Sequence, residues 1–111
     1  MAIQTTSADP LIRATLEFLA GELPPGARLI IFGSRAAGNA RDDSDLDLLV
    51  IEPDVTDRRA EMARLAELLG RHLVPADVVV LSSETFGLQR GIPNTLAWQA
   101  ARQGVEYAVG G

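Results

Sequence analysis

The sequence predicts a small α/β fold, in which a mixed sheet of three to four strands is flanked by helices. Two short apolar runs at residues 29–32 and 45–51 are bounded by turn residues, which is typical of buried strands. Around them, apolar residues recur at the spacing of an amphipathic helix. Helices and strands that mix in this order pack as helices against one sheet.

The helices are predicted from capping residues and from apolar periodicity. Asp9 and Pro10 are the residue types of an N-cap and a first helical position, so a helix is expected over 9–20. A second helix is expected over 56–73, with Met62, Leu65, Leu69 and Leu73 on one face. Residues 82–84 should cap a short helical turn, and a last helix should cover 93–103.

The strands follow from apolar runs that have a glycine or proline at one end. Besides 29–32 and 45–51, a strand is expected over 76–81, and residues 105–107 should add an edge strand. The segment 33–44 is rich in Gly, Ser, Asn, Asp and Arg, which indicates that it is mostly loop. Trp98 and Tyr107 are expected in the core.

Composition limits the function. The chain has 111 residues, of which 47% are hydrophobic, so we expect a single domain over 1–111. It has no cysteine and no apolar run near the roughly 20 residues of a membrane span, so we expect a soluble cytoplasmic protein. A net charge of −5 argues against general nucleic-acid binding, since the nucleic-acid backbone is itself an anion.

Acidic side chains cluster where strands are expected to begin. Side chains alternate along a strand, so Asp45 and Asp47 should share one face, roughly 6.5 to 7 Å apart. At an effective dielectric near 20, these charges would repel by about 2.5 kcal/mol. Asp77, in the next strand along the chain, should point at the same place. A divalent cation such as Mg²⁺ removes this repulsion, and its preferred ligands are oxygen atoms.

Gly33 and Ser34 directly follow the first apolar strand. A residue without a side chain lets the backbone approach a phosphate closely, while the Ser34 hydroxyl and free amides supply donors. The Gly-Lys-Ser/Thr ending of a Walker loop is absent, so this is a different kind of phosphate cradle. By itself a Gly-Ser pair is more often an ordinary turn. The aspartates that follow make the functional interpretation the stronger one.

Together these residues resemble a known signature. Gly33-Ser34, ten intervening residues and Asp45-Leu46-Asp47 look like the signature of the DNA polymerase β-like nucleotidyltransferases. The string from Phe32 to Gly38, followed by residues 44–50, is closer still to the minimal nucleotidyltransferases of prokaryotes. Asp77 resembles the third carboxylate of that family, and residues 97–107 resemble its usual C-terminal ending.

The resemblance implies a fold, cofactors, a donor and a partner. It implies a polymerase β-like nucleotidyltransferase fold, two Mg²⁺ ions and transfer of AMP from ATP. Asp45, Asp47 and Asp77 would be the catalytic and metal-binding residues, and Gly33 and Ser34 would hold phosphates. The acceptor implied is a hydroxyl group, commonly a tyrosine, of a helical HEPN toxin, for which this chain would be the antitoxin.

Several alternatives remain open at the level of sequence. Arg35 and Arg41 suit phosphates, but loop arginines are as often solvated. His72 is expected at the end of a helix, where its charge favours the helix dipole rather than catalysis. The chain could instead be an antitoxin that masks its partner stoichiometrically, or a transferase acting on a small molecule such as an aminoglycoside. A homo-oligomer or hetero-oligomer is compatible with each of these functions.

Overall fold

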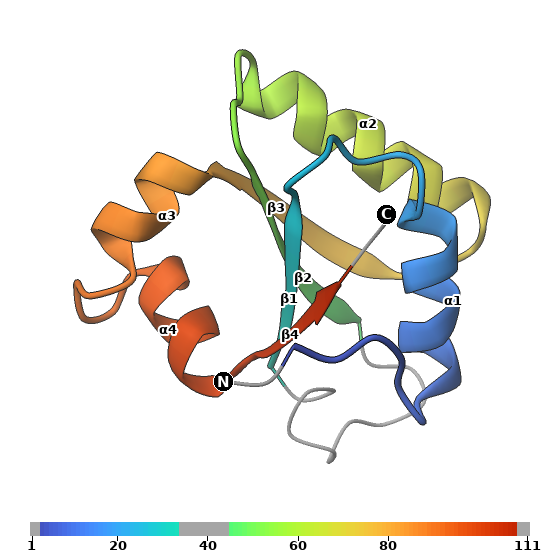
Figure 1. Ribbon diagram of the computed structural model, residues 1–111. Coiled ribbons are helices and arrows are strands. Elements are labelled where there is room, and N and C mark those ends of the chain that lie inside the picture. Colours follow the sequence, from blue (N-terminus) through green and yellow to red (C-terminus); the bar gives the residue numbers. More distant parts are fainter. Residues whose placement is uncertain (1–2, 34–44, 109–111) are drawn as a thin grey trace.

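A computed structural model describes residues 3–33 and 45–108, and Figure 1 shows their arrangement. The described residues form helices and strands that mix along the chain, as predicted. In chain order these are α1 (Pro10–Leu19), β1 (Arg28–Phe32), β2 (Leu46–Glu52), α2 (Arg58–Arg71), β3 (Ala76–Ser82), α3 (Ser83–Gln89), α4 (Leu96–Gln103) and β4 (Val105–Ala108).

The strands form one mixed sheet in the order β3-β2-β1-β4. The central strands β1 and β2 are antiparallel, β4 is antiparallel to β1, and β3 is parallel to β2. Helix α2 makes the crossover that a parallel pair requires. The predicted mixed sheet of three to four strands with flanking helices is therefore confirmed, including β4 at one edge.

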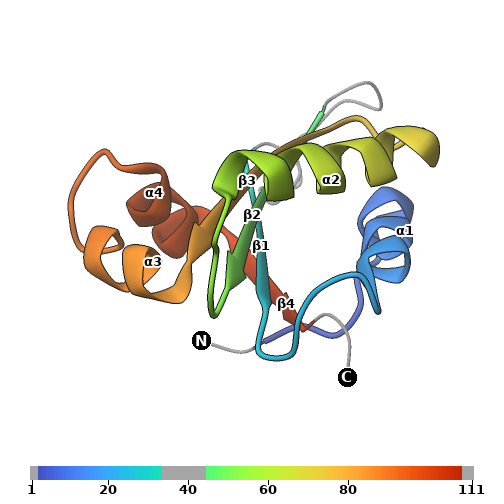
Figure 2. The ribbon, with the colours of Figure 1, turned by 90° about the horizontal axis from the view of Figure 1, so that it is seen from above.

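Each face of the sheet buries its own hydrophobic core, and Figure 2 shows the sheet between two groups of helices. On one face, α1 and α2 cover alternate residues of the central strands, among them Leu46, Leu48 and Val50. On the other face, α3 and α4 cover the intervening residues, including Leu49 and Ile51. The run 46–51 is apolar throughout because β2 is buried on both sides.

The first helix begins as its sequence predicts. The Asp9 carboxylate accepts hydrogen bonds from the amides of Leu11 (2.8 Å) and Ile12 (3.4 Å), and Pro10 occupies the first turn. The segment before it follows the outer edge of β4. Gln4 donates its amide to Glu106 O (2.9 Å) and accepts from the amide of Ala108 (2.9 Å), which covers part of that edge.

The end of α2 departs from the predicted pattern. The helix ends at Arg71, and Leu73, expected on the buried face, has a φ of 60° and is 88% exposed. The amide of Leu73 bonds Gly70 O (3.0 Å) and that of Val74 bonds Leu69 O (2.9 Å). These two bonds form a Schellman motif, in which the residue after the cap turns outward in the left-handed conformation.

The last two helices also differ from the prediction. The turn expected at 82–84 is a longer helix, α3, whose Ser82 cap accepts the Thr85 amide (3.1 Å). The last helix begins at Leu96, later than expected, because Asn94 has a φ of 71° and cannot join a right-handed helix. No helix within 3–33 and 45–108 is long and apolar enough to span a membrane.

The two aromatic residues expected in the core differ in their burial. Tyr107 is 6% exposed and packs in the core beneath α1 and α2. Trp98 is half-buried on α4, and the Arg102 guanidinium lies 5.0 Å from the centroid of its ring. The expectation is confirmed for Tyr107, whereas Trp98 keeps part of its ring at the surface.

Candidate active site

Three strand ends meet at one end of the sheet. Phe32, the last residue of β1, pairs in register with Asp47 near the start of β2. Asp47 in turn pairs with Asp77 near the start of β3. The topology explains this convergence, because antiparallel β1 ends where β2 begins and parallel β3 begins beside it. Residues far apart in the sequence are thereby brought together at one end of the sheet.

The structure brings Asp47 and Asp77 together more closely than their sequence spacing indicates. Neighbouring strands lie about 4.8 Å apart, and side chains at the same register position share a face of the sheet. Asp45 immediately precedes β2, two residues from Asp47 and thus on the same side of an extended chain. Asp45 and Asp77 are exposed, whereas Asp47 is half-buried between them.

The surroundings of Asp47 disfavour its charge. Burial raises the pKa of the Asp47 carboxyl above its ordinary value, and the negative charges of Asp77 and then Asp45 raise it further. The order of the two charges agrees with the geometry, since Asp77 is the register partner. A cation bound at this point would reverse these unfavourable interactions.

Gly33 lies directly against the Asp47 carboxylate. Its φ is +78°, a conformation that side-chain-bearing residues rarely adopt. A Cβ at this position would collide with Oδ2 of Asp47 and would lie 3.2 Å from its Cγ. The positive φ therefore favours glycine here, and a Cβ would in addition force the Asp47 carboxylate to move. The backbone of Gly33 is consequently held beside a carboxylate that could bind a metal ion.

The other predicted site residues cannot be compared with the structure in the same way. Ser34, Arg35 and Arg41 lie outside the described residues, as does the predicted loop after Gly33. Within the described segments, no three acidic, histidine or cysteine side chains stand in positions that could together hold a metal ion. Asp47 and Asp77 are adjacent, but with Asp45 they do not form a ready three-ligand cage.

The residues present nevertheless fit a hydrated Mg²⁺ ion. Mg²⁺ keeps several waters and is usually bound by one or two carboxylates together with substrate phosphates, rather than by an all-protein cage. Asp47 and Asp77 supply two adjacent carboxylates, and Gly33, which has no side chain, lets the backbone lie against the Asp47 carboxylate. The donor set consists of hard oxygen atoms, which suit Mg²⁺ better than a softer metal.

One residue beside this site was not singled out from the sequence. Phe32 is 6% exposed and, as the register partner of Asp47, contributes an apolar ring to the same face of the sheet. In the sequence Phe32 ends an apolar run and begins the string that carries the family resemblance, but neither observation indicates that it pairs with Asp47.

The single histidine belongs to a different part of the molecule. His72 is the C-cap residue of α2, as its sequence position indicates. Its ring stacks on Phe18 of α1, with centroids 3.9 Å apart and planes inclined by 10°. This contact joins the two helices on the face of the sheet opposite Asp47. His72 is therefore a packing residue between helices.

Comparisons with known proteins identify the family. A solved structure described as a toxin-antitoxin with AMP-PNP is similar in fold, with a TM-score of 0.58 and 24% identity over 82% of this chain and 67% of that chain. A search of curated proteins gives no significant match. Residues 12–103, most of the chain, match the profile described as "Nucleotidyltransferase domain". The observed mixed sheet is consistent with a polymerase β-like fold. The chain therefore belongs to the nucleotidyltransferase domain family, whose members generally use a nucleoside triphosphate and a divalent metal ion.

Proposed function

We propose that this nucleotidyltransferase transfers AMP from ATP to a tyrosine hydroxyl of a helical HEPN-family toxin and thereby acts as its antitoxin. The observation that carries the proposal is the register pair of Asp47 and Asp77 beside Gly33, in a chain of this family. Two further facts support the partner and the donor. The neighbouring structure is a toxin-antitoxin, and AMP-PNP, an analogue of ATP, is bound there.

In this proposal the chain mainly binds and orients. Asp45 and Asp47 would hold two Mg²⁺ ions, and Asp77 would complete one of the two sites. The Gly33 backbone, with Ser34, would lie against the β- and γ-phosphates, and Arg35 and Arg41 would steady the same groups. When bound, Mg²⁺ supplies neutralisation of the charge on the attacking and leaving oxygen atoms.

The transfer is an in-line displacement at phosphorus. The acceptor oxygen forms a bond to the α-phosphorus of ATP, the bond from that phosphorus to the bridging oxygen breaks, and pyrophosphate leaves. The hydroxyl proton passes to a carboxylate, for which Asp77 is the candidate because it is exposed and next to Asp47. Such chemistry depends mostly on positioning and electrostatic stabilisation, so few catalytic side chains are needed.

A turnover experiment distinguishes catalysis from masking. The toxin is supplied in excess over this protein with ATP and Mg²⁺, and both toxin activity and intact mass are measured. We expect most of the toxin to be silenced, with a gain of about 329 Da for each AMP added, because pyrophosphate departs. A protein that only masks its partner cannot inactivate more than its own molar amount.

The matched control is the Asp45→Asn, Asp47→Asn double variant, which removes charge with little change in packed volume. We expect it to lose the mass shift and the catalytic silencing while it still binds the toxin. Equal protection by this variant at equal dose, without a mass shift, would replace transfer by stoichiometric masking. Transfer to an aminoglycoside but to no protein hydroxyl would contradict the proposed acceptor.

A further inference from the structure

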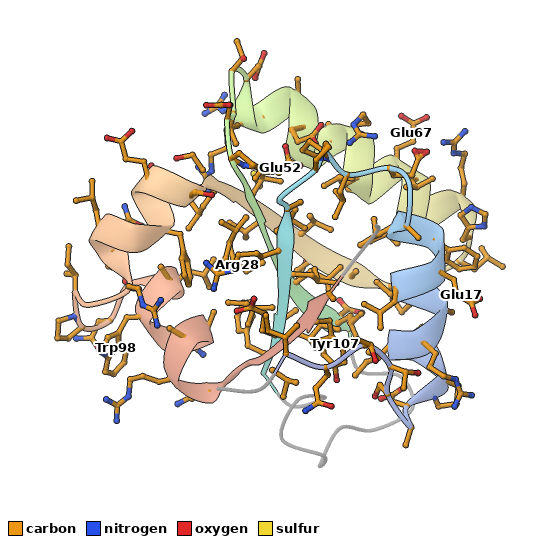
Figure 3. All side chains as sticks on the ribbon, viewed as in Figure 1. Glu17, Arg28, Glu52, Glu67, Trp98 and Tyr107 are labelled. Carbon is orange, nitrogen blue, oxygen red and sulfur yellow. The ribbon has the colours of Figure 1, made fainter. Side chains whose placement is uncertain are left out.

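A second acidic region lies at the opposite end of β2. An open groove of about 430 Å³ runs between the turn before β1 and the first turns of α2. Its lining includes Glu52, at the end of β2, and Glu61 and Arg64 on α2. Figure 3 shows Glu52 close to the start of α2, whereas Glu67 lies on the outer side of that helix.

The Glu52 carboxyl group is buried, and one of its oxygen atoms lacks a hydrogen-bond partner among the described residues. The residue is 4% exposed, and its Oε2 atom has no hydrogen-bond partner within the described parts of the chain. It follows Val50 by two positions on β2, so its side chain points to the same face, toward α2. A buried carboxylate oxygen without a partner is costly, and natural proteins leave few such atoms. The atom therefore requires an explanation.

The arginine in the groove does not supply the missing partner, because it is already engaged. Arg64 donates to both carboxylate oxygens of Glu61, at 2.8 and 2.9 Å, and to the backbone oxygen of Glu22 at 2.8 Å. Burial is the largest cause that raises the pKa of Glu52. A hydrogen bond to Glu61 and the negative charge of Glu61 raise this pKa further, to about 7. Glu61, stabilised by Arg64, has its pKa lowered to about 2. Glu52 therefore becomes charged near neutral pH.

The rest of the groove combines negative charge with aliphatic surface. Asp54 and Asp57 add two carboxylates to its lining, although the Asp57 side chain also caps α2 through the Ala60 amide (3.1 Å). Pro24, Val55 and Ala60 form apolar parts of the wall. Within the described residues these acids are not arranged to hold a metal ion. An organic cation with an aliphatic stem fits this combination better.

We propose that this groove binds an alkylammonium or alkylguanidinium group, with the cationic head on Glu52 Oε2 and the aliphatic stem against Pro24, Val55 and Ala60. The ligand is a lysine or arginine side chain of another protein, or a free polyamine, which carries the same head group on the same kind of stem. The site is separate from the nucleotide site, and it does not rest on the proposed transfer of AMP.

Calorimetric titration with agmatine at pH 8 tests the site, because agmatine carries a guanidinium and an ammonium group on one aliphatic chain. We expect saturable binding that weakens about 10-fold or more in Glu52→Gln, since a hydrogen bond to a charged group is lost. The matched control is Glu67→Gln, which removes the same charge from the exposed side of α2 and should change the affinity by less than about 2-fold. Affinity should also rise from pH 5 to pH 8, as Glu52 ionises.

A second variant protects the test against a folding defect. Asp54→Asn alters an exposed residue of the groove lining and should weaken agmatine binding about 2- to 3-fold through the weaker local field. Unchanged affinity in Glu52→Gln with a normal thermal midpoint would overturn the proposal, as would an absence of saturable binding to the parent protein. Equal losses in Glu52→Gln and Glu67→Gln would also overturn it, because net charge alone would then account for binding.

Two further ligands distinguish the sources of the cation. Arginine blocked at both ends as N-acetyl and N-methylamide imitates a side chain within a protein, whereas spermidine represents a free polyamine. Tighter binding of the blocked arginine supports a partner protein, and tighter binding of spermidine supports a polyamine. Failure of both to compete with agmatine would overturn the assignment of the groove to biological cations.

Discussion

The two ends of β2 both carry carboxylates that the fold makes costly, but they differ in what surrounds them. At the beginning, Asp47 faces α3 and α4 and has two further acids beside it. At the end, Glu52 faces α2 and lies beside Glu61, which Arg64 already neutralises, while Asp54 and Asp57 line the same groove. Clustered like charges favour a multivalent cation, whereas one unpartnered oxygen in an aliphatic groove favours a single organic cation.

The two ends of β2 also differ in how closely the backbone of another segment approaches the carboxylate. Gly33 lies directly against the Asp47 carboxylate, and any side chain there would collide with it. Glu52 instead lies in a groove that is lined by side chains of α2 and of residues 54–57, which precede this helix. The first end is therefore suited to a phosphate with its metal ion, and the second to the side chain of a ligand.

The largest expected effect is on transfer activity. Asp47→Asn should reduce AMP transfer by more than about 100-fold, because even changes to outer-shell partners of metal ligands cost roughly 10- to 100-fold. Glu67→Gln, which removes one negative charge from the exposed side of α2, should retain the parent rate. Rates of product formation with ATP and Mg²⁺ measure both. Comparable losses in the two variants would mean that net charge, rather than the site, controls the activity.

A comparison of two glycines should give the next largest effect. Gly33→Ala combines a positive φ with a collision at Asp47 and should destabilise the protein by about 1–3 kcal/mol, with loss of nucleotide binding. Gly87→Ala has open space around its Cβ in α3 and should stabilise by about 0.5–1 kcal/mol. Denaturant unfolding measures both changes. A Gly33→Ala protein as stable as the parent would show that Asp47 does not occupy this position.

The Glu52 end makes a prediction about pH. The folded protein keeps the Glu52 proton up to about pH 7, whereas the unfolded chain loses it near its ordinary pKa of 4.5. The associated stability is fully present below pH 4.5 and is lost as the pH rises through 7. Glu61, with a pKa lowered to about 2, contributes stability above pH 4.5 that is lost as the pH falls toward 2.

The Glu52→Gln variant has no buried carboxyl to ionise, so it does not lose this stability as the pH rises through 7. Its thermal midpoint should therefore exceed that of the parent by about 4 °C or more at pH 8, corresponding to about 1 kcal/mol, and by much less at pH 4. Thermal unfolding across this range measures the difference. If the difference in thermal midpoint between the variant and the parent does not change with pH, Glu52 is not held in its protonated form.

The smallest effect concerns the thermal stability of the protein when the proposed nucleotide site holds no metal. Asp47→Asn relieves both burial of a charge and repulsion from its neighbours, so in EDTA it should raise the thermal midpoint by roughly 2–4 °C. In 10 mM Mg²⁺ this advantage should shrink or reverse, since only the parent gains from the ion. A substantial loss of stability in EDTA would mean that Asp47 has a structural role.

The candidate site residues at the first end of β2 can be identified in the sequence because the relevant information is local. The alternation of Asp45 with Asp47, and the Gly33-Ser34 pair, are visible as residue types at fixed spacing. The strand register that makes Asp77 the neighbour of Asp47 depends on the parallel pairing of β3, which spacing alone does not specify. Only the folded chain shows that Asp77 is the register partner of Asp47, and the charge of Asp77 raises the Asp47 pKa more than that of Asp45 does.

The second end of β2 could not be predicted because its character arises from packing. Glu52 follows an apolar run and precedes Pro53, which in sequence resembles an ordinary polar strand end. Its burial depends on α2 returning over the sheet, and its missing partner depends on Arg64 bonding elsewhere. Leu73 is a second case in which packing decides the outcome. Its apolar side chain indicates a place in the core, but the Schellman motif turns it toward solvent.

Titration of ATP into the protein by calorimetry tests most directly whether the beginning of β2 is a metal-dependent nucleotide site. We predict measurable affinity in Mg²⁺ and a decrease of at least about 10-fold in EDTA, because without the ion the acids repel the phosphates. We predict the same decrease for Asp45→Asn, Asp47→Asn in Mg²⁺, because this variant lacks the carboxylates that would bind the ion. Glu67→Gln should bind as the parent does. Equal affinity of the parent in Mg²⁺ and EDTA, or unchanged binding by the folded double variant, would contradict the account.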